Sequence, residues 1–142
     1  MSRIAYLTGI EFGPGALASL AEATGEFGMR RPLLVADKGV QAAGLVAKAT
    51  APPPAGTPLF LDTPPTPTES AVLAALAQYK AEGCDGIVAL GGGSPIDLAK
   101  GVALLATHDG PLEQYAMIYG GLGRIGAHVA PVIAIPTTAG TG

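Results

Sequence analysis

The feature that most constrains this chain is an apolar segment that leads directly into a cluster of glycines. Residues 86–90 are apolar on both faces, Gly91, Gly92 and Gly93 follow, and residues 94–107 have the periodicity of a helix. A strand without a polar face is typical of a parallel sheet that helices cover on both sides. The segment therefore predicts a strand, a tight loop and a helix of an α/β domain.

Other parts of the chain repeat this alternation of strand and helix. Strands are expected at residues 33–36, 59–61 and 132–135, the first and the last of them buried, and helices at residues 14–24, 40–49 and 69–82. Thr68 is expected to cap the last of these helices, and Gly83 to follow its end. Alternating strands and helices fold as a parallel sheet between two helix layers, which predicts a three-layer α/β domain.

Composition excludes several classes of protein. The 142 residues are the length of one domain, and 8 basic against 11 acidic side chains give a net charge of −3, so no nucleic-acid partner is expected. No run of about 18 apolar residues predicts a membrane span, and the N-terminus does not resemble a signal peptide. The single cysteine, Cys84, is expected to be a buried, inert thiol in a cytoplasmic protein.

The glycine cluster predicts a phosphate site. Glycine lets a bulky anion approach the backbone, and the N-terminus of a helix presents free N–H groups and a partial positive charge. Ser94 is expected to be the N-cap, Pro95 the first helical residue and Asp97 the acid of a capping box. Ile96 stands where G-x-G-x-x-G needs a glycine, and no P-loop is present. The alternative is a plain connection between strand and helix.

Polar residues follow two other predicted strands. Asp37 lies at the carboxyl end of the strand at 33–36, where a carboxylate can hold a ribose 2′-hydroxyl and repel a 2′-phosphate. Thr137, Thr138 and Thr141 follow the last predicted strand, and their hydroxyls can donate to phosphate or ribose oxygens. Simple turns are the alternative at both places.

Together these segments resemble the iron-containing (group III) alcohol dehydrogenase family. GGGSPIDLAK at 91–100 and IPTTAGTG at 135–142 carry most of the resemblance. Supporting motifs are FGPGAL at 12–17, RPLLVADKGV at 31–40, DTPPTPTES at 62–70 and GPLEQY at 110–115. The resemblance implies that residues 1–142 are a Rossmann-like dinucleotide-binding domain of an NAD(P)-dependent oxidoreductase, which moves hydride between an alcohol or carbonyl carbon and nicotinamide.

The resemblance also implies roles for individual residues. Asp37 is the acid that favours NAD over NADP, the glycines with Ser94 cradle the pyrophosphate, Asp97 lies beside them, and the threonine loop covers the pyrophosphate and nicotinamide ribose. Thr66 stands where the family's Pro-Asn-Pro-Thr loop has Asn, near the adenosine. The implied cofactor-binding residues are Asp37, Thr66, Gly91, Gly92, Gly93, Ser94, Asp97, Thr137, Thr138 and Thr141.

The family's iron, or another divalent metal, is bound by one Asp and three His that lie farther along the family's chains. His108 and His128 do not match those positions. The chain is therefore expected to be the front part of a longer protein and to be inactive toward alcohols alone. Small alcohols or aldehydes are the expected substrates, and homo-oligomer formation is left open. A polyol dehydrogenase or dehydroquinate synthase relative, or a non-catalytic nucleotide-binding module, are the alternatives.

Overall fold

A computed structural model describes residues 8–50 and 56–139 of the chain. Its four strands form one parallel sheet with the order β2-β1-β3-β4. The strands are β1 (Pro32–Val35), β2 (Leu59–Phe60), β3 (Gly86–Gly91) and β4 (Val132–Pro136). The register places Leu34 beside Leu59 and Val88, and Val88 beside Ile133. The predicted parallel sheet is confirmed.

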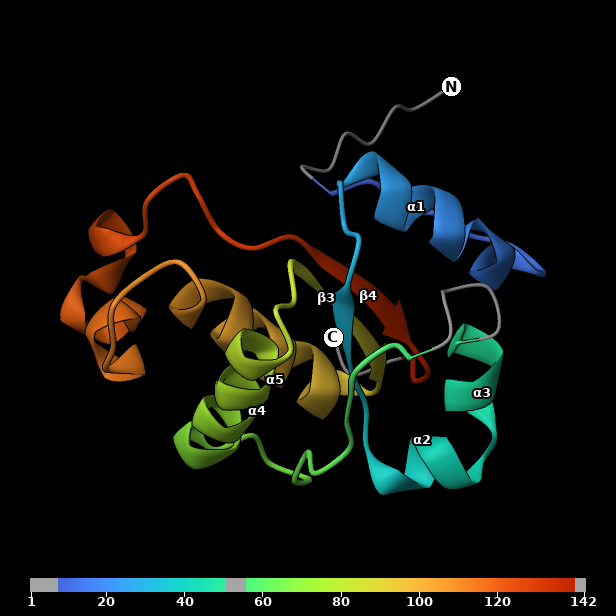
Figure 1. Ribbon diagram of the computed structural model, residues 1–142. Helices are drawn as coiled ribbons and strands as arrows, with labels where there is room; N and C mark the ends of the chain where they lie inside the picture. The colour runs from blue at the N-terminus through green and yellow to red at the C-terminus, as the bar shows by residue number, and fades with distance from the viewer. Residues whose placement is uncertain (1–7, 51–55, 140–142) are drawn as a thin grey trace.

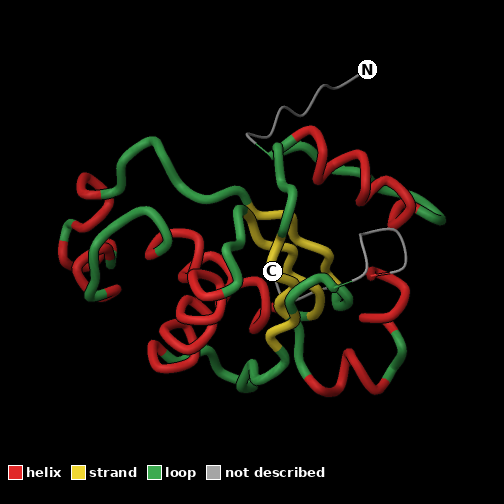
Figure 2. Tube along the Cα trace, viewed as in Figure 1, coloured by secondary structure: helices red, strands yellow, loops and turns green. Residues whose placement is uncertain are grey.

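Helices cover both faces of this sheet. Figure 1 shows α4 and α5 on one side and α1 and α3 on the other, and Figure 2 shows the strands between them. The α-helices are α1 (Leu20–Glu26), α2 (Lys38–Ala42), α3 (Leu45–Thr50), α4 (Glu69–Ala81) and α5 (Gly93–Leu105). The 3-10 helices are η1 (Ala16–Ser19), η2 (Leu112–Tyr115), η3 (Met117–Tyr119) and η4 (Gly121–Arg124). None of the helices in the described residues is long and apolar enough to cross a membrane.

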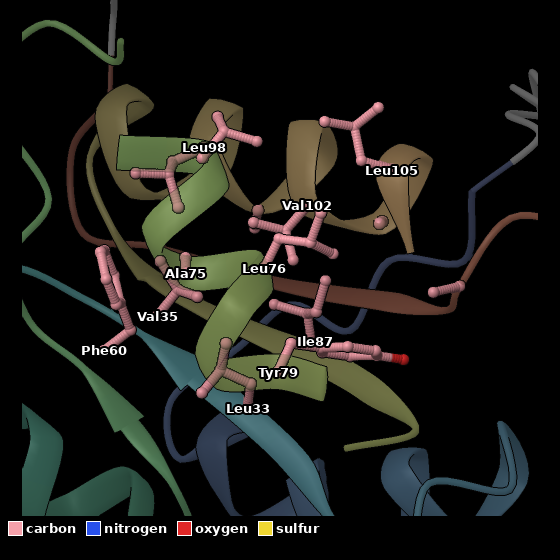
Figure 3. Close-up of a cluster of buried hydrophobic side chains, with 14 of the residues drawn as sticks. Leu33, Val35, Phe60, Ala75, Leu76, Tyr79, Ile87, Leu98, Val102 and Leu105 are labelled. Carbon is pink, nitrogen blue, oxygen red and sulfur yellow. The ribbon is translucent and has the colours of Figure 1, made fainter. Parts of the chain in front are cut away.

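Two apolar clusters hold the layers together. Successive side chains of a strand point to opposite faces of the sheet. Leu33 and Ile87 therefore pack with α4 and α5, as Figure 3 shows, and Leu98 and Val102 of α5 are fully buried against them. The other face contributes Leu34, Ala36, Val88 and Leu90, which pack with Leu20 of α1 and with Val46 and Ala49 of α3. Burial of one such large side chain stabilises the fold by ~1.5–3 kcal/mol.

Local signals predicted α4 well. The Thr68 hydroxyl accepts a hydrogen bond of 3.2 Å from the Ala71 N–H, which confirms the cap. Gly83 ends the helix with φ +64°, a conformation that favours glycine. Val72, Leu76 and Tyr79 form the buried face, as their spacing predicts.

Two helix predictions were wrong in their boundaries. Residues 40–49 do not form one helix, because Gly44 has φ +74° and separates α2 from α3. The segment predicted at 14–24 begins as η1 and continues as α1 to Glu26. Gly25 therefore lies inside α1, and the turn comes at Gly28, with φ +68°.

The prediction that the last strand is buried was also wrong. Among the described strands, β4 pairs with β3 alone and is an edge of the sheet. Ala134 and Pro136 are exposed, and the other three residues of β4 are half-buried. An edge strand has a neighbour on one side only, so its side chains keep more contact with water.

Candidate functional site

The strand order creates a switch point between β1 and β3. The chain passes from β1 to β2 on one side and returns to β3 on the other. In open parallel sheets, ligands bind at the carboxyl ends of the strands at such a point. Asp37 follows β1, and Gly91, Gly92 and Gly93 lead from β3 into α5. Two of the segments that the sequence indicates for cofactor binding therefore lie on the two sides of the switch point.

The three glycines have different environments. Gly91 has φ +148°, and a Cβ there would lie 2.7 Å from Cγ of Pro95, so a larger residue fits only if Pro95 moves. Gly92 is the N-cap of α5, and a Cβ on it would meet Thr138 Oγ1 at 3.4 Å. A Cβ on Gly93 would meet no atom within 4 Å. The first turn of α5 is therefore open to a ligand beside Gly93, as a phosphate site requires.

The prediction that Ser94 caps α5 was wrong. Gly92 takes the extended backbone of an N-cap, with φ −78° and ψ −159°, and makes no side-chain cap. The N-cap therefore lies two residues earlier than predicted, and Ser94 lies in the first turn of the helix. Its hydroxyl donates a 2.5 Å hydrogen bond to the carbonyl oxygen of Pro65 instead.

The capping box expected at Asp97 is absent for the same reason. With the N-cap at Gly92, Pro95 becomes the third helical residue rather than the first, and Asp97 lies beyond it. The Asp97 carboxylate instead pairs with Lys100 one turn along, at 3.5 Å, and both side chains are exposed. The structure thus places the Asp97 side chain on the outer surface of α5, one turn after Gly93.

The threonine loop contacts the loop formed by Gly91, Gly92 and Gly93, called the glycine loop below. The backbone N–H of Thr137 donates a 2.8 Å hydrogen bond to the carbonyl oxygen of Gly91. Thr138 lies next to Gly92, since its Oγ1 is the nearest atom to a Cβ built there. Thr141 lies outside the described residues. The structure therefore brings two of the three predicted threonines to the start of α5.

A third segment, residues 62–68, reaches the same place. The bond from Ser94 holds Pro65 against α5, and Thr66 is the next residue, with its side chain exposed. Segments from the ends of β2, β3 and β4, far apart in the sequence, therefore converge on the first turn of α5.

Asp37 has a local structural role, as the alternative to cofactor binding at this position anticipated. It is half-buried at the N-cap of α2, and its Oδ1 accepts a 2.8 Å hydrogen bond from the Val40 N–H. Its other oxygen, Oδ2, makes no hydrogen bond with the described residues. The capping role is compatible with a contact to ribose, because one carboxylate oxygen bonds to the helix and the other has no hydrogen-bond partner in the described part of the chain.

Sequence reasoning missed three residues near Asp37. Thr63 is buried and donates a 2.7 Å hydrogen bond to the carbonyl oxygen of Ala36. Lys38 Nζ lies 2.8 Å from Asp62 Oδ1, and a hydrogen bond and the opposite charge of Asp62 raise the Lys38 pKa. The sequence shows opposite charges after the segments at 33–36 and 59–61, but the pairing became visible only with the strand order.

The remaining titratable candidates have structural surroundings. His108 Nε2 accepts a 2.9 Å hydrogen bond from the Gly126 N–H, and its ring lies edge-on to Tyr115. Cys84 is half-buried rather than buried, and burial raises the pKa of its thiol. Residues 8–50 and 56–139 hold no group of three or more His, Cys, Asp or Glu side chains placed to bind a metal ion.

Comparison with known proteins decides the family. The model of the iron-containing alcohol dehydrogenases matches residues 8–142. The chain belongs to this family. Among curated relatives, 4-hydroxybutyrate dehydrogenase of Cupriavidus necator is 53% identical over 100% of the chain and 37% of its own length. The 1,3-propanediol dehydrogenase of Klebsiella pneumoniae is 38% identical over 92% of the chain and 34% of its own length.

Solved structures of iron-containing alcohol dehydrogenases and related enzymes share the fold. A 1,3-propanediol oxidoreductase superposes with a TM-score of 0.81 and 37% identity, over 92% of this chain and 34% of that one. Sulfoacetaldehyde reductase from Bifidobacterium kashiwanohense, solved in complex with NAD+, gives a TM-score of 0.76 and 27% identity, over 99% of this chain and 37% of that one. The chain spans about a third of the length of the proteins it matches. The family match favours the alcohol dehydrogenases over the polyol dehydrogenase and dehydroquinate synthase alternatives.

Proposed function

We propose that residues 1–142 are the dinucleotide-binding domain of an NAD-dependent oxidoreductase that interconverts alcohols and carbonyl compounds. The observation that carries this proposal is the convergence of three segments on the first turn of α5. Thr137 bonds to Gly91, and Ser94 bonds to Pro65, so the glycine loop lies between the other two segments. Membership of the iron-containing alcohol dehydrogenases supports the same reading.

The residues present fit a dinucleotide. The first turn belongs to a helix of 13 residues, α5, and open space beside Gly93 leaves the N–H groups of that turn accessible to the pyrophosphate. Thr137 and Thr138 are exposed and would donate to phosphate or ribose oxygens. When bound, NAD supplies the nicotinamide carbon that exchanges hydride.

The other end of the cofactor would lie toward β1 and β2. Asp37 would accept a hydrogen bond from the adenosine ribose through Oδ2, and Thr66 would lie beside the adenosine. A carboxylate at this place repels a 2′-phosphate, so NAD would be preferred to NADP. The NAD+ complex of the related sulfoacetaldehyde reductase supports this choice of cofactor.

Substrate and metal belong to the proposal as well. Two relatives are named for 4-hydroxybutyrate and 1,3-propanediol, which are short chains with a terminal hydroxyl. We therefore propose a short primary alcohol and its aldehyde as the substrates of the whole protein. The described residues hold no group of three or more His, Cys, Asp or Glu side chains placed to bind the family's iron. A cytoplasmic location remains a prediction, and homo-oligomer formation stays open.

Isothermal titration calorimetry of the 142-residue chain with NAD+, NADP+ and AMP tests the proposal. We expect saturable binding of NAD+, weaker binding of NADP+, and AMP binding that competes with NAD+. A folded chain that releases no heat with any of the three at millimolar concentration would overturn the proposed function. Binding that is equal for all nucleotides, including GMP as a control, would favour a non-specific phosphate site.

A further inference from the structure

The geometry points to Asp62 as a second specificity-determining residue of the cofactor site, which acts by keeping Lys38 away from a 2′-phosphate. This inference rests on the proposed function, because it concerns which dinucleotide the site accepts. It adds to Asp37, whose role the family resemblance already implies. Asp62 lies in a different segment, after β2 rather than after β1.

The fold brings the two segments together. Asp37 and Asp62 form an isolated antiparallel bridge, just beyond the parallel pairing of β1 with β2. The buried Thr63 hydroxyl bonds to the carbonyl oxygen of Ala36 at 2.7 Å, which holds the segment after β2 against the end of β1. The position of Asp62 beside Lys38 is therefore fixed by backbone pairing and one buried hydrogen bond.

The charges at this place determine which ribose fits. Lys38 Nζ lies 2.8 Å from Asp62 Oδ1, and about three quarters of each side chain is exposed to solvent. Lys38 is thus a cation that a ligand can reach, next in the chain to the proposed ribose acid Asp37. A 2′-phosphate needs such a cation, and an ammonium group serves as a phosphate ligand.

In the protein as it stands, that cation already has a partner. A 2′-phosphate would have to displace Asp62 from Lys38 and would then face two carboxylates, Asp37 and Asp62. A ribose 2′-hydroxyl carries no charge and meets neither obstacle. The site would thus discriminate against NADP in two ways, because the Asp62 carboxylate repels the 2′-phosphate and also occupies Lys38. Specificity in proteins commonly uses such repulsive elements. Asp62 is the one ion-pair partner of Lys38 among the described residues, so replacing Asp62 releases Lys38.

The test compares three variants by titration calorimetry with NAD+ and NADP+. Asp62→Ala should bind NADP+ about tenfold more tightly than the unsubstituted chain, the gain expected of one charge-assisted hydrogen bond, with NAD+ affinity changed less than about twofold. The double variant Asp62→Ala with Lys38→Ala should lose that gain. Glu82→Ala is the matched control, because it removes one negative charge and breaks the 2.6 Å pair with Arg31 at the opposite end of the sheet.

The outcomes separate this inference from the proposed function. If the unsubstituted chain binds no dinucleotide, the proposed function fails and the inference fails with it. If NAD+ binds but Asp62→Ala leaves the NADP+ affinity unchanged, the inference alone is overturned. Two further results would also overturn it. The same gain in Glu82→Ala would assign the effect to net charge, and the same gain in the double variant would assign it to loss of the Asp62 carboxylate, with no part for Lys38. Urea unfolding of each variant checks the fold, and Asp62→Asn replaces Asp62→Ala if alanine prevents folding.

Discussion

The backbone N–H of Thr137 donates a 2.8 Å hydrogen bond to the carbonyl oxygen of Gly91, two residues that are 46 positions apart. The bond continues the parallel pairing of β3 with β4 by one residue, past Gly91 and Pro136. It fixes the threonine loop beside the glycine loop before any ligand is present. A site prepared in this way loses less conformational entropy on binding than one assembled from mobile loops.

Gly91 should be the least replaceable glycine of the loop for folding. In Gly91→Ala, the methyl group would lie 2.7 Å from Pro95 Cγ and the backbone would keep φ +148°, so the free energy of unfolding should fall by about 1–3 kcal/mol. Gly93→Ala is the control, with open space and no such φ. Urea denaturation measures both, and equal stability of the two variants would contradict the prediction.

Asp37 should have two separable roles. Asp37→Asn keeps an oxygen for the Val40 N–H, so stability should change little, while loss of the charge should narrow the preference for NAD+ over NADP+ by ~1–3 kcal/mol. Asp37→Ala should also lose about 1 kcal/mol of stability, because α2 loses its cap. Calorimetric titration and urea unfolding separate the two effects. Unchanged discrimination in Asp37→Asn would rule out the ribose role.

The Ser94 hydroxyl should hold the segment at 62–68 against the start of α5. Ser94→Ala removes the hydrogen bond to Pro65, so stability should fall by ~0.5–1.5 kcal/mol and NAD+ affinity should fall as the segment at 62–68 loosens. Ser19→Ala is the control, because its hydroxyl bonds only to the nearby Ala16 carbonyl. A loss of NAD+ affinity in both variants, or in neither, would argue against this role of Ser94.

Stability should fall at alkaline pH. Burial raises the pKa of the Cys84 thiol and of the Tyr79 hydroxyl, so the folded chain holds these protons more tightly than the unfolded chain does. The contribution of Cys84 is complete below the ordinary thiol pKa of about 8.5 and is lost as pH rises through the raised value. Urea unfolding at pH 7 and pH 9.5 measures the decline, and Cys84→Ala should reduce it. A decline of the same size in Cys84→Ala would exclude the thiol as a cause.

The three-layer arrangement could be predicted because a strand that is buried on both faces shows as a continuous apolar run within a single segment of sequence. The continuous apolar run at residues 86–90 and the cap at Thr68 depend on neighbours in the chain, and both were confirmed. The start of α5 was misplaced because Gly92 and Ser94 are both acceptable N-caps, and the choice depends on a distant carbonyl at Pro65.

The pairing of segments could not be predicted from the chain alone. The contact of Lys38 with Asp62 depends on β1 and β2 being neighbours in the sheet, and no local pattern gives the strand order. The exposure of β4 has the same origin, because residues 132–136 are as apolar as those of an inner strand. Tertiary pairing, rather than local propensity, decided each of these features.

Gly93→Val distinguishes a pyrophosphate site at the first turn of α5 from a plain connection between β3 and α5. A side chain at Gly93 meets no protein atom within 4 Å of its Cβ, so the variant should fold, while its methyl groups fill the space that the phosphate needs. Gly123→Val, also at an open glycine but in η4, is the control. Calorimetry should show NAD+ binding at least about tenfold weaker in Gly93→Val and unchanged in Gly123→Val. Full NAD+ affinity in a folded Gly93→Val chain would show that the pyrophosphate does not bind at the first turn of α5.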